Sequence, residues 1–454
     1  MVGKPEHADT IAAIATASGQ GAVGVVKISG PDSGSIVSAL CRLKPGHREA
    51  RYTAFYDAEG QVLDRGLALF FQGPDSHTGE DIAELHGHGG PVVMNLLLQR
   101  VLSLGARYAR PGEFSERAFL NNKIDLLQAE AVADLISSAS EQAALSAVRS
   151  MEGAFSFRLD ELANKVIELR MFVEATLDFP EEEIDSIAQT ELHERLADCR
   201  QCLADISARA ETGRLLAEGL KIAIIGKPNA GKSSLLNRLA EVERAIVSPL
   251  PGTTRDTIEQ QILIDGIPVG VIDTAGIRKA GDLIEEEGIR RARSAAGSAD
   301  VVILIADATG DDIQNLQTIA ADLGTEKKLL YAFNKIDLSG HEAGKSESAR
   351  GAREIYISAK TGAGIGELKR EIKDIVAGSD FSENSFIAHT RHIDILRTAG
   401  DLLEQAAEQF RRTRAVELFA EDLTRLHRTL GEITGEYTSD DLLGEIFSRF
   451  CIGK

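Results

Sequence analysis

The sequence predicts a multidomain fold of mixed α/β and α class, and its length of 454 residues is typical of roughly three domains. From about residue 219 to 377, strand-like and helical stretches alternate, as in an α/β domain with a parallel sheet. Helical periodicity occupies both flanks of this region. Its apolar stripes are Leu159, Leu162, Val166, Leu169 and Val173 on one side, and Phe419, Leu423, Leu426 and Leu430 on the other. Each flank is short of a full core. We therefore predict one α-helical domain in two chain segments, with the α/β domain inserted between them.

The first part of the chain has a mixed pattern that favours an α+β domain. Strand-like runs at Val23–Ile28 and Leu67–Phe71 are separated by turn residues, and Pro91–Leu104 reads as a helix. Near Ala118 this mixed pattern of strands and helices is replaced by a mostly helical pattern. We expect domain boundaries that give an N-terminal domain at 1–118, helical segments at 119–216 and 379–454, and the inserted domain at 217–378.

The composition restricts the classes of partner. The formal net charge is −20, whereas a protein that holds nucleic acid by itself usually shows a basic face. The short basic clusters, Arg411, Arg412 and Arg414, and Arg425 with Arg428, read as solvated helix faces. If RNA is bound, another protein or a local patch must help.

Cysteine content and hydropathy indicate a cellular setting. Four cysteines without paired spacings favour a reducing cytoplasm. Cys199 and Cys202 spell CxxC inside a polar helical run, without a second pair or nearby histidines, so we interpret the match as chance. Ile11–Ala17 is too short and too weakly apolar to span a bilayer, and we expect no membrane association.

A phosphate-binding loop at Gly226–Ser233 lies about halfway along the chain, between the strand-like Leu220–Ile225 and a helix through Ser234–Leu239. Its glycines let backbone N–H groups converge on phosphate oxygens at a helix N-terminus. Lys232 is expected to contact the β and γ phosphates, and the Ser233 hydroxyl to ligate Mg²⁺. The residues predicted to bind nucleotide here are Asn229, Ala230, Gly231, Lys232, Ser233 and Ser234.

Three further motifs, each after a strand-like run, identify the nucleotide as GTP. In Asp273-Thr274-Ala275-Gly276 the carboxylate can hold the Mg²⁺ shell, and the Gly276 amide can approach the γ-phosphate. In Asn334-Lys335-Ile336-Asp337 the Asp337 carboxylate can accept from guanine N1–H and N2–H₂, an arrangement that adenine lacks. In Ser358-Ala359-Lys360 a backbone N–H can bond guanine O6.

The residue that activates water is not evident from these motifs. Where some small GTPases have a glutamine after the DTAG glycine, this chain has Ile277, so another residue or an extra cation must act. Arg278 and the acidic run Glu285–Glu287 are the candidates, although a charged helix start also explains that run. Pro251–Asp256 is a candidate switch loop, in which Thr253 or Thr254 can complete the Mg²⁺ shell.

Motifs outside the α/β region carry a family resemblance. They are Asp9–Thr16, Gly24–Gly30, Thr78–Asp81, Glu84-Leu85, Gly87–Pro91, Arg110–Asn121, Lys123 and the ending Cys451-Ile452-Gly453-Lys454. With the central motifs, they make the whole chain resemble the tRNA modification GTPase family called MnmE or TrmE. A generic ribosome-assembly GTPase would share only the middle third.

The resemblance implies a fold, a reaction and partners. It implies an N-terminal folate-binding domain that forms a homodimer, and an inserted Ras-like P-loop G domain. It further implies a flavoprotein partner, MnmG (GidA), in a heterotetramer that acts on tRNA. The implied reaction adds an aminomethyl or carboxymethylaminomethyl group at C5 of the wobble uridine. The one-carbon unit would come from a tetrahydrofolate derivative of the 5-formyl or 5,10-methylene type.

The resemblance also implies site residues. Glu84, Lys123 and Lys454 would bind folate, joined by Lys27, where the family usually has an arginine and thus a bidentate contact. Asn229 would ligate K⁺, with Ser248, Leu250 and Thr253 from the adjoining loop, and Thr254 would be the Mg²⁺ threonine. Glu285 would orient the attacking water. Cys451 has either a chemical role or that of an ordinary free thiol.

Two other functions are compatible with the G domain alone. One is a ribosome-assembly or regulatory RNA-binding GTPase, in which hydrolysis times docking on RNA. The other is a scaffold whose G domain sets dimer geometry. Neither needs the N-terminal folate motifs or the Cys451–Lys454 ending.

Overall fold

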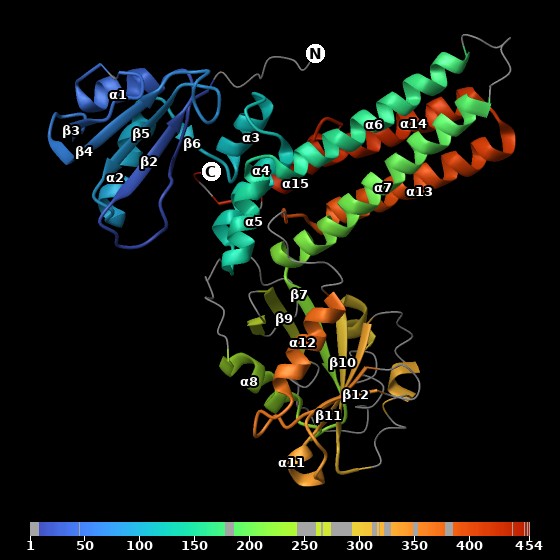
Figure 1. The fold of residues 1–454 in the computed structure, drawn as a ribbon. Helices are drawn as coiled ribbons and strands as arrows, with labels where there is room; N and C mark the ends of the chain where they lie inside the picture. Colours follow the sequence, from blue (N-terminus) through green and yellow to red (C-terminus); the bar gives the residue numbers. More distant parts are fainter. Residues whose placement is uncertain are drawn as a thin grey trace. The chain divides into compact units, whose positions relative to one another are not determined.

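The computed structural model describes residues 9–44, 46–177, 186–242, 260–264, 267–273, 293–310, 316, 318–321, 328–347, 353–376, 385–437, 439–448, 450–451 and 453. The chain forms two compact units, one of residues 1–133 with 427–454 and one of residues 134–426. Helices α4 (Leu126–Ser137) and α14 (Val416–Thr434) cross the boundary between them. The predicted fold class is confirmed: an α+β N-terminal region, a helical region in two chain segments, and an inserted Ras-like α/β domain (Figure 1).

The first unit contains a six-stranded sheet in the order β3-β4-β5-β2-β1-β6. Its strands are β1 (Ile11–Ile14), β2 (Gly24–Ser29), β3 (Arg51–Tyr56), β4 (Val62–Phe71), β5 (Ile82–Gly87) and β6 (Arg107–Tyr108). Its helices are α1 (Ser33–Cys41), α2 (Pro91–Ser103), α3 (Glu113–Leu120) and α15 (Asp440–Ser448). The predicted strands and helix in this region are confirmed as β2, β4 and α2.

Alternation along the strands gives this sheet two different faces. Val26 and Ile28 of β2 and Leu85 of β5 point to the face where α1 and α2 pack, and all three are fully buried. The residues between them therefore point to the opposite face, because successive side chains of a strand alternate. Lys27 and Glu84 are such residues. Ile11 and Ala13 lie on that opposite face too, packed against Ala109 and Phe114.

A buried arginine organises the start of α3. Arg117 is 1% exposed, and its guanidinium contacts Glu80 at 3.0 Å, Asp9 at 2.8 Å and Glu113 at 3.2 Å. Glu113 is also buried and pairs with Arg107. Burial opposes the Glu113 charge, yet hydrogen bonds from Arg107 and the Arg110 amide outweigh it and lower the Glu113 pKa to about 2. Several of the family-motif charges thus hold the fold together.

The C-terminal segment packs onto α3 and α4 within the same unit. Phe447 and Phe450 form an apolar cluster with Leu126 and Ala129. A Cβ on Gly112 would lie 2.5 Å from the Phe447 carbonyl oxygen, so only a glycine allows this approach.

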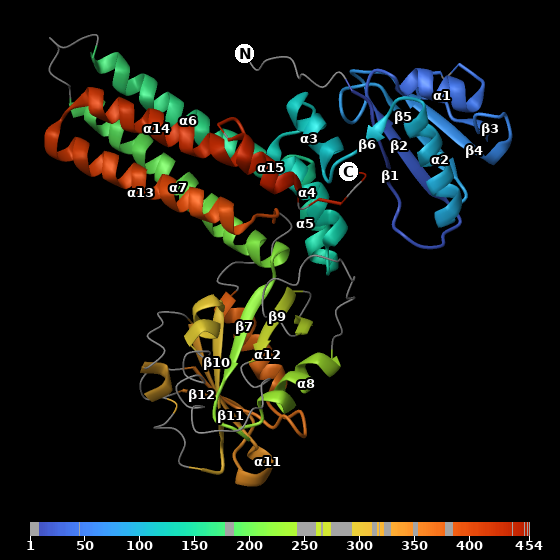
Figure 2. The same ribbon diagram turned by 180° about the vertical axis from the view of Figure 1, so that it is seen from behind.

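The helical part of the second unit is built from long helices. They are α5 (Glu141–Met151), α6 (Ala154–Leu177), α7 (Ser186–Ala217) and α13 (Thr390–Thr413), with the first part of α14. The predicted stripe from Leu159 to Val173 is buried along α6, and the stripe from Phe419 to Leu430 is buried along α14. Helix α7 packs against both α6 and α13, and Figures 1 and 2 show α13 alongside α7 from opposite sides. An ion pair joins Arg200 of α7 to Glu404 of α13 at 2.6 Å.

The inserted domain has a seven-stranded sheet in the order β12-β13-β11-β10-β7-β9-β8. Its strands are β7 (Leu220–Ile225), β8 (Gln260–Ile264), β9 (Ile267–Asp273), β10 (Val301–Asp307), β11 (Lys328–Asn334), β12 (Gly344–Glu347) and β13 (Arg353–Tyr356). Its labelled helices are α8 (Lys232–Val242), α11 (Ile336–Ser339) and α12 (Ile365–Val376). Strands β9, β7, β10, β11 and β13 are parallel, so their carboxyl ends meet at one edge.

Both faces of this sheet are covered, as the predicted class requires. Ile222 and Ile224 of β7 face a core that includes Leu235 of α8 and Leu368 of α12. Ala223 and Ile225 face the opposite core, which includes Ala296 from the helical stretch at 293–298.

Polar contacts tie the inserted domain to the helices that flank it in the sequence. Glu218 accepts from the Thr390 amide at 2.7 Å, and Arg214 pairs with Asp300 at 3.0 Å. Burial disfavours the Glu218 charge, but hydrogen bonds from His389 and Thr390 outweigh that effect and lower its pKa to about 2.

Within the described ranges, no helix is long and apolar enough to cross a membrane. Cys199 and Cys202 lie on α7, where burial raises the pKa of the Cys199 thiol to about 11. Across that same described part of the chain, no group of three or more His, Cys, Asp or Glu side chains could hold a metal ion.

Candidate functional site

The phosphate-binding loop follows β7 and ends at α8, as predicted. Asn229 has a φ of 65° and Gly231 a φ of 98°, so the loop reverses in the left-handed region. The Lys232 ammonium crosses the loop and donates to the carbonyl oxygens of Gly226 at 2.6 Å and Lys227 at 2.9 Å. Ser233 and Ser234 are exposed in the first turn of α8, where the helix dipole favours an anion.

A cradle for the nucleotide is visible in the packing around Gly231. A Cβ on Gly231 would overlap the Asn334 side-chain nitrogen, and a Cβ on Gly226 would overlap the Ile305 carbonyl oxygen. Only glycines allow backbone and neighbours to approach this closely. With amides, an ammonium and a serine hydroxyl at one helix end, the donor set fits a Mg²⁺-bound phosphate chain.

Asn334 connects this loop to the Ser358–Lys360 segment, which we call the guanine loop. The Asn334 amide nitrogen donates to the Ala230 carbonyl oxygen at 2.9 Å. Its amide oxygen accepts from the Ala359 backbone N–H, also at 2.9 Å. Asn334 is 3% exposed, so these contacts fix its orientation and bring the first and last motifs together.

Asp337 and Lys335 lie beside this connection. Asp337 is exposed, and its Oδ1 accepts from the buried Ser358 hydroxyl at 2.7 Å, which orients the carboxylate. A carboxylate has about four acceptor positions, so Asp337 can also accept from a ligand. Lys335 has a φ of 70° and pairs with Asp307 at 2.6 Å. The hydrogen bond from Lys335, with those from Thr309, lowers the Asp307 pKa to about 2.

Sequence reasoning missed Asp307 and Arg238. Asp307 ends β10 in register with Asn334 of β11, so its place at the carboxyl edge was a usable signal. Arg238 of α8 donates to the carbonyl oxygens of Ala359 at 3.1 Å and Lys360 at 2.5 Å. No motif includes Arg238, and only the folded helix brings it to the guanine loop.

Several predicted residues lie outside the described part of the chain. These are Ser248, Leu250, Thr253, Thr254, Thr274, Ala275, Gly276, Arg278, Glu285 and Lys454. The backbone of Asp273 ends β9 and is in register with Ile224 of β7, so its Cα lies at the same edge as the phosphate-binding loop.

A second candidate site lies on the face of the N-terminal sheet opposite to α1 and α2. Lys27 of β2 and Glu84 of β5 are register partners across adjacent strands. The Lys27 ammonium lies 5.0 Å from the centre of the Phe114 ring, and Glu84 contacts His86 at 2.9 Å. We call this pair and its surroundings the Lys27–Glu84 face. It offers a cation, a carboxylate and an aromatic ring, which suits a ligand with both N–H donors and carboxylates.

The loop at 73–80 connects Lys123 to this face. Lys123 donates to the Pro74 carbonyl oxygen at 2.9 Å, and its stem packs on Gly79. From the same loop, His77 interacts electrostatically with Lys27 and Glu84. Desolvation and the positive charge of Lys27 lower the His77 pKa to about 4, against the opposing effect of Glu84. No motif in the sequence singles out His77.

The C-terminal motif comes back to the same sheet. The Cys451 carbonyl oxygen accepts from the Gly112 amide at 3.4 Å, and Cys451 is exposed. Gly453 is buried with a φ of 99°, and a Cβ there would lie 2.7 Å from the Ile14 carbonyl oxygen. Ile14 pairs with Val26, the neighbour of Lys27. The end of the chain therefore lies within the N-terminal unit.

Family models match nearly the whole chain. The model described as the GTP-binding protein TrmE N-terminus matches residues 10–123. The model described as the MnmE helical domain matches residues 126–451, a span that includes the inserted domain.

Two relatives that match over nearly their whole length share the same name. A protein of Chromohalobacter salexigens named tRNA modification GTPase MnmE is 51% identical over 450 residues, covering 98% of both chains. A protein of the same name from Pseudomonas aeruginosa is 50% identical, covering 98% of this chain and 99% of its own. Among solved structures, the G domain of the T. maritima FeoB iron transporter is 30% identical, covers 34% of this chain and 98% of its own, and has a TM-score of 0.26.

Proposed function

The chain belongs to the MnmE family of tRNA modification GTPases, and we propose that it modifies C5 of the wobble uridine in certain tRNAs. The proposed product carries an aminomethyl or carboxymethylaminomethyl group. The proposed partner is a flavoprotein of the MnmG (GidA) type, in a heterotetramer around a homodimer of this chain. We place the reaction in the cytoplasm, and we keep 1–118, 119–216, 217–378 and 379–454 as proposed domain boundaries.

The observation that carries this proposal is the Lys27–Glu84 face, because a GTPase that only times RNA docking has no use for it. A bound tetrahydrofolate derivative, 5-formyl or 5,10-methylene, would supply the one-carbon unit. Glu84 would accept from the pterin N–H donors, by the same acceptor chemistry that Asp337 uses for guanine. Lys27, Lys123 and Lys454 would neutralise its carboxylate and carbonyl groups. Gly453 against Ile14 supports the assignment of Lys454.

GTP hydrolysis would use the residues of the inserted domain in separate roles. Lys232 would contact the β and γ phosphates, and Ser233, Thr254 and Asp273 would hold Mg²⁺, which supplies positive charge to the phosphates. Asn334, Asp337 and the guanine loop would bind the base. Glu285 would orient the attacking water, with Arg278 as the alternative, and Cys451 stays a proposed reactive thiol.

We also propose that K⁺ stimulates hydrolysis through Asn229, Ser248, Leu250 and Thr253, where the ion would supply charge that an arginine supplies elsewhere. Asn229 is exposed in the phosphate-binding loop, with a left-handed φ of 65°, so its side chain is open to solvent and available to a ligand. Turnover should be much faster in KCl than in NaCl at equal ionic strength. Equal rates in the two salts would instead favour Arg278 acting in cis.

The folate proposal is tested by exchanging Glu84 for glutamine. Glu84→Gln keeps the shape but loses the carboxylate, so cells that carry it should lack the wobble-uridine product while the purified protein still hydrolyses GTP. Glu49→Gln, an exposed carboxylate paired with Arg51 in the same unit, is the matched control and should leave modification intact. Normal tRNA in the Glu84→Gln strain would contradict the folate role and favour a regulatory RNA-binding GTPase.

The catalytic role of Glu285 has its own test. Glu285→Ala should leave GTP affinity nearly intact and lower kcat by roughly 10²-fold, as loss of a water-orienting group does. If Glu285 only begins a helix, turnover should not change.

A further inference from the structure

Arg238 belongs to none of the nucleotide motifs, yet it holds the guanine loop. It lies on α8, half-buried, and one guanidinium contacts two successive carbonyl oxygens of that loop. The bond from Nε to Ala359 is 3.1 Å long, and the bond from Nη2 to Lys360 is 2.5 Å long. Bonds from an ionised donor are roughly twice as strong as neutral ones, so this grip fixes the loop backbone.

Because Arg238 fixes the direction of the Ala359 carbonyl, it also fixes the direction of the Lys360 backbone N–H. The Ala359 carbonyl and the Lys360 N–H belong to one trans peptide plane, in which the two groups point in opposite directions. Because Arg238 holds the carbonyl toward α8, the Lys360 amide is directed away from α8. A charged donor on the carbonyl also polarises the peptide, which makes its N–H a better donor.

Other amides of this turn already have partners within the protein. The Ala359 amide donates to Asn334 at 2.9 Å. The Thr361 amide donates to the Ser358 hydroxyl at 3.2 Å, and the Gly362 amide donates to the Ser358 carbonyl oxygen at 2.8 Å. The Lys360 amide is therefore the one we assign to the ligand.

We propose that Arg238 is a positioning residue for guanine recognition, which orients and polarises the Ala359–Lys360 peptide so that the Lys360 amide donates to the 6-oxo group. The proposal rests on the proposed assignment of Asn334, Asp337 and the guanine loop to the base. It adds a residue from the phosphate side of the site, since α8 begins with Lys232 and Ser233. A single helix then contacts both ends of the nucleotide.

The test compares nucleotides that differ at one position of the base. GTP and 6-thio-GTP differ only in the acceptor at C6, and sulfur is the weaker acceptor. GTP and inosine triphosphate differ only in the 2-amino group. In the full-length Arg238→Ala protein, affinity for GTP and inosine triphosphate should fall about tenfold, and affinity for 6-thio-GTP by about threefold or less, as for one lost charge-assisted contact. The preference for oxygen over sulfur therefore shrinks, while the preference for the 2-amino group is unchanged.

A general structural role for Arg238 predicts a different result. It would weaken all three nucleotides by the same factor, and this outcome, like unchanged affinities, would overturn the proposal. Arg238→Lys keeps the charge but not the two-pronged contact, so its ratio of GTP to 6-thio-GTP affinity should lie between those of wild type and Arg238→Ala. If Arg238→Ala does not fold, the ratio in Arg238→Lys decides, and an unchanged ratio overturns the proposal.

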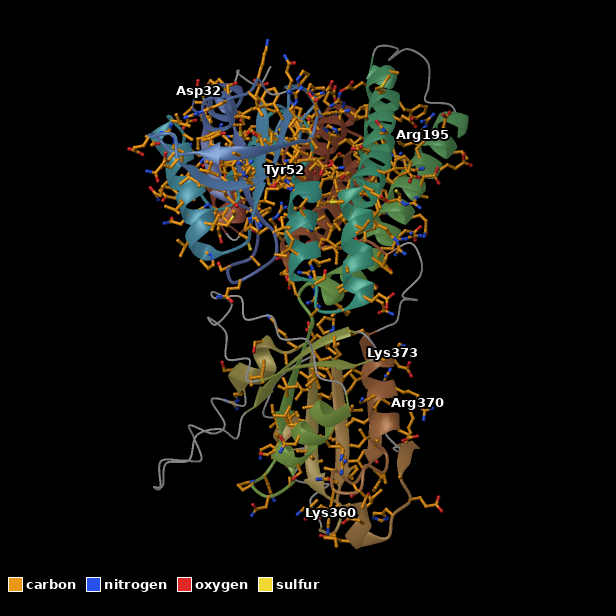
Figure 3. All side chains as sticks on the ribbon, turned by 90° about the vertical axis from the view of Figure 1, so that its left-hand side faces the viewer. Asp32, Tyr52, Arg195, Lys360, Arg370 and Lys373 are labelled. Atoms are coloured by element: carbon orange, nitrogen blue, oxygen red, sulfur yellow. The ribbon has the colours of Figure 1, made fainter. Side chains whose placement is uncertain are left out.

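Two controls separate this inference from its premise. Arg370, on α12, pairs with Glu367, and its side chain is 69% exposed. Figure 3 shows Arg370 apart from Lys360 in the inserted domain, so Arg370→Ala should leave the affinity for every nucleotide unchanged. Asp337→Asn should weaken the binding of GTP and allow partial binding of xanthosine triphosphate. If Asp337→Asn does not have this effect, the assignment of the guanine site fails. If Asp337→Asn has this effect but Arg238→Ala weakens the binding of all nucleotides equally, only the role of Arg238 fails.

Discussion

The nucleotide site and the Lys27–Glu84 face are assembled in opposite ways. In the inserted domain, each binding motif directly follows a strand, and parallel pairing brings those strand ends to one edge. On the Lys27–Glu84 face, the residues come from the middle of two antiparallel strands, from a loop and from the end of the chain.

The difference shows where each site is vulnerable. The nucleotide site depends on close backbone approach, so a single added methyl group at a glycine disrupts it. The Lys27–Glu84 face depends on distant segments that the buried Arg117 and the C-terminal segment hold in place. Substitution of those supporting residues should disturb the Lys27–Glu84 face, although the substituted residues are not themselves proposed to contact the ligand. The following predictions test this contrast, from the largest effect to the smallest.

The largest effect is expected at Arg117. Arg117→Ala leaves Glu80 without its cation, whereas the buried Glu113 loses one cation and keeps Arg107, so the substitution should cost about 3 kcal/mol, the lower end for breaking a buried pair. Thermal unfolding with hydrogen exchange should show the N-terminal unit opening first, while GTP hydrolysis persists. Arg51→Ala removes an exposed partner of Glu49 and should leave the melting curve unchanged. A wild-type melting curve for Arg117→Ala would contradict the supporting role of this cluster.

Gly231→Ala should damage the nucleotide site alone. The new Cβ would overlap the Asn334 side chain at a backbone φ of 98°, and strain of this kind costs about 1–3 kcal/mol, so GTP affinity should fall roughly 5- to 150-fold. Gly366→Ala, in open space on α12, is the control and should bind GTP normally. Folate binding should not change in either variant; if Gly231→Ala weakened it, the two sites would not be independent.

Gly453→Ala tests whether the C-terminal segment supports the Lys27–Glu84 face. A Cβ 2.7 Å from the Ile14 carbonyl oxygen, at a φ of 99°, should cost about 1–2 kcal/mol and release the end of the chain. Limited proteolysis should then remove the C-terminal residues faster, and folate affinity should drop about threefold to tenfold. Gly444→Ala on α15 meets nothing within 4 Å and serves as the control. Unchanged folate affinity in a protein with a released C-terminus would separate Lys454 from the site.

The smallest effect is expected for the Asp307–Lys335 pair. The Asp307 pKa is lowered to about 2 from an ordinary value of 3.8, so the pair stabilises the fold above about pH 4 and this contribution is lost as the pH falls through 2. Because the pair is near the surface, Asp307→Asn should cost about 1 kcal/mol at neutral pH. Unfolding curves of wild type and variant should converge near pH 2. A constant difference across that range would mean that the pair is not the cause.

The two regions also differ in how much of each was predictable. Strand β7 has the bounds predicted from the sequence, and the helix after it contains the predicted segment, because a phosphate-binding loop requires that local order. The stripes on α6 and α14 were predictable for a similar reason, since helical period marks the buried side. Lys27 and Glu84 entered through the family resemblance, because a lone lysine and glutamate in a sequence look like surface charges.

By itself, the sequence determined where the phosphate-binding loop lies between a strand and a helix, and which side of each long helix is buried, because both depend on local spacing along the chain. Tertiary structure alone decided that Arg238 holds the guanine loop, that Asn334 joins it to the phosphate-binding loop, and that His77 lies in the field of Lys27 and Glu84. The contacts of Arg238 and Asn334 join residues that are 121 and 104 positions apart. Their geometry depends on strand pairing and helix packing, which no local pattern records.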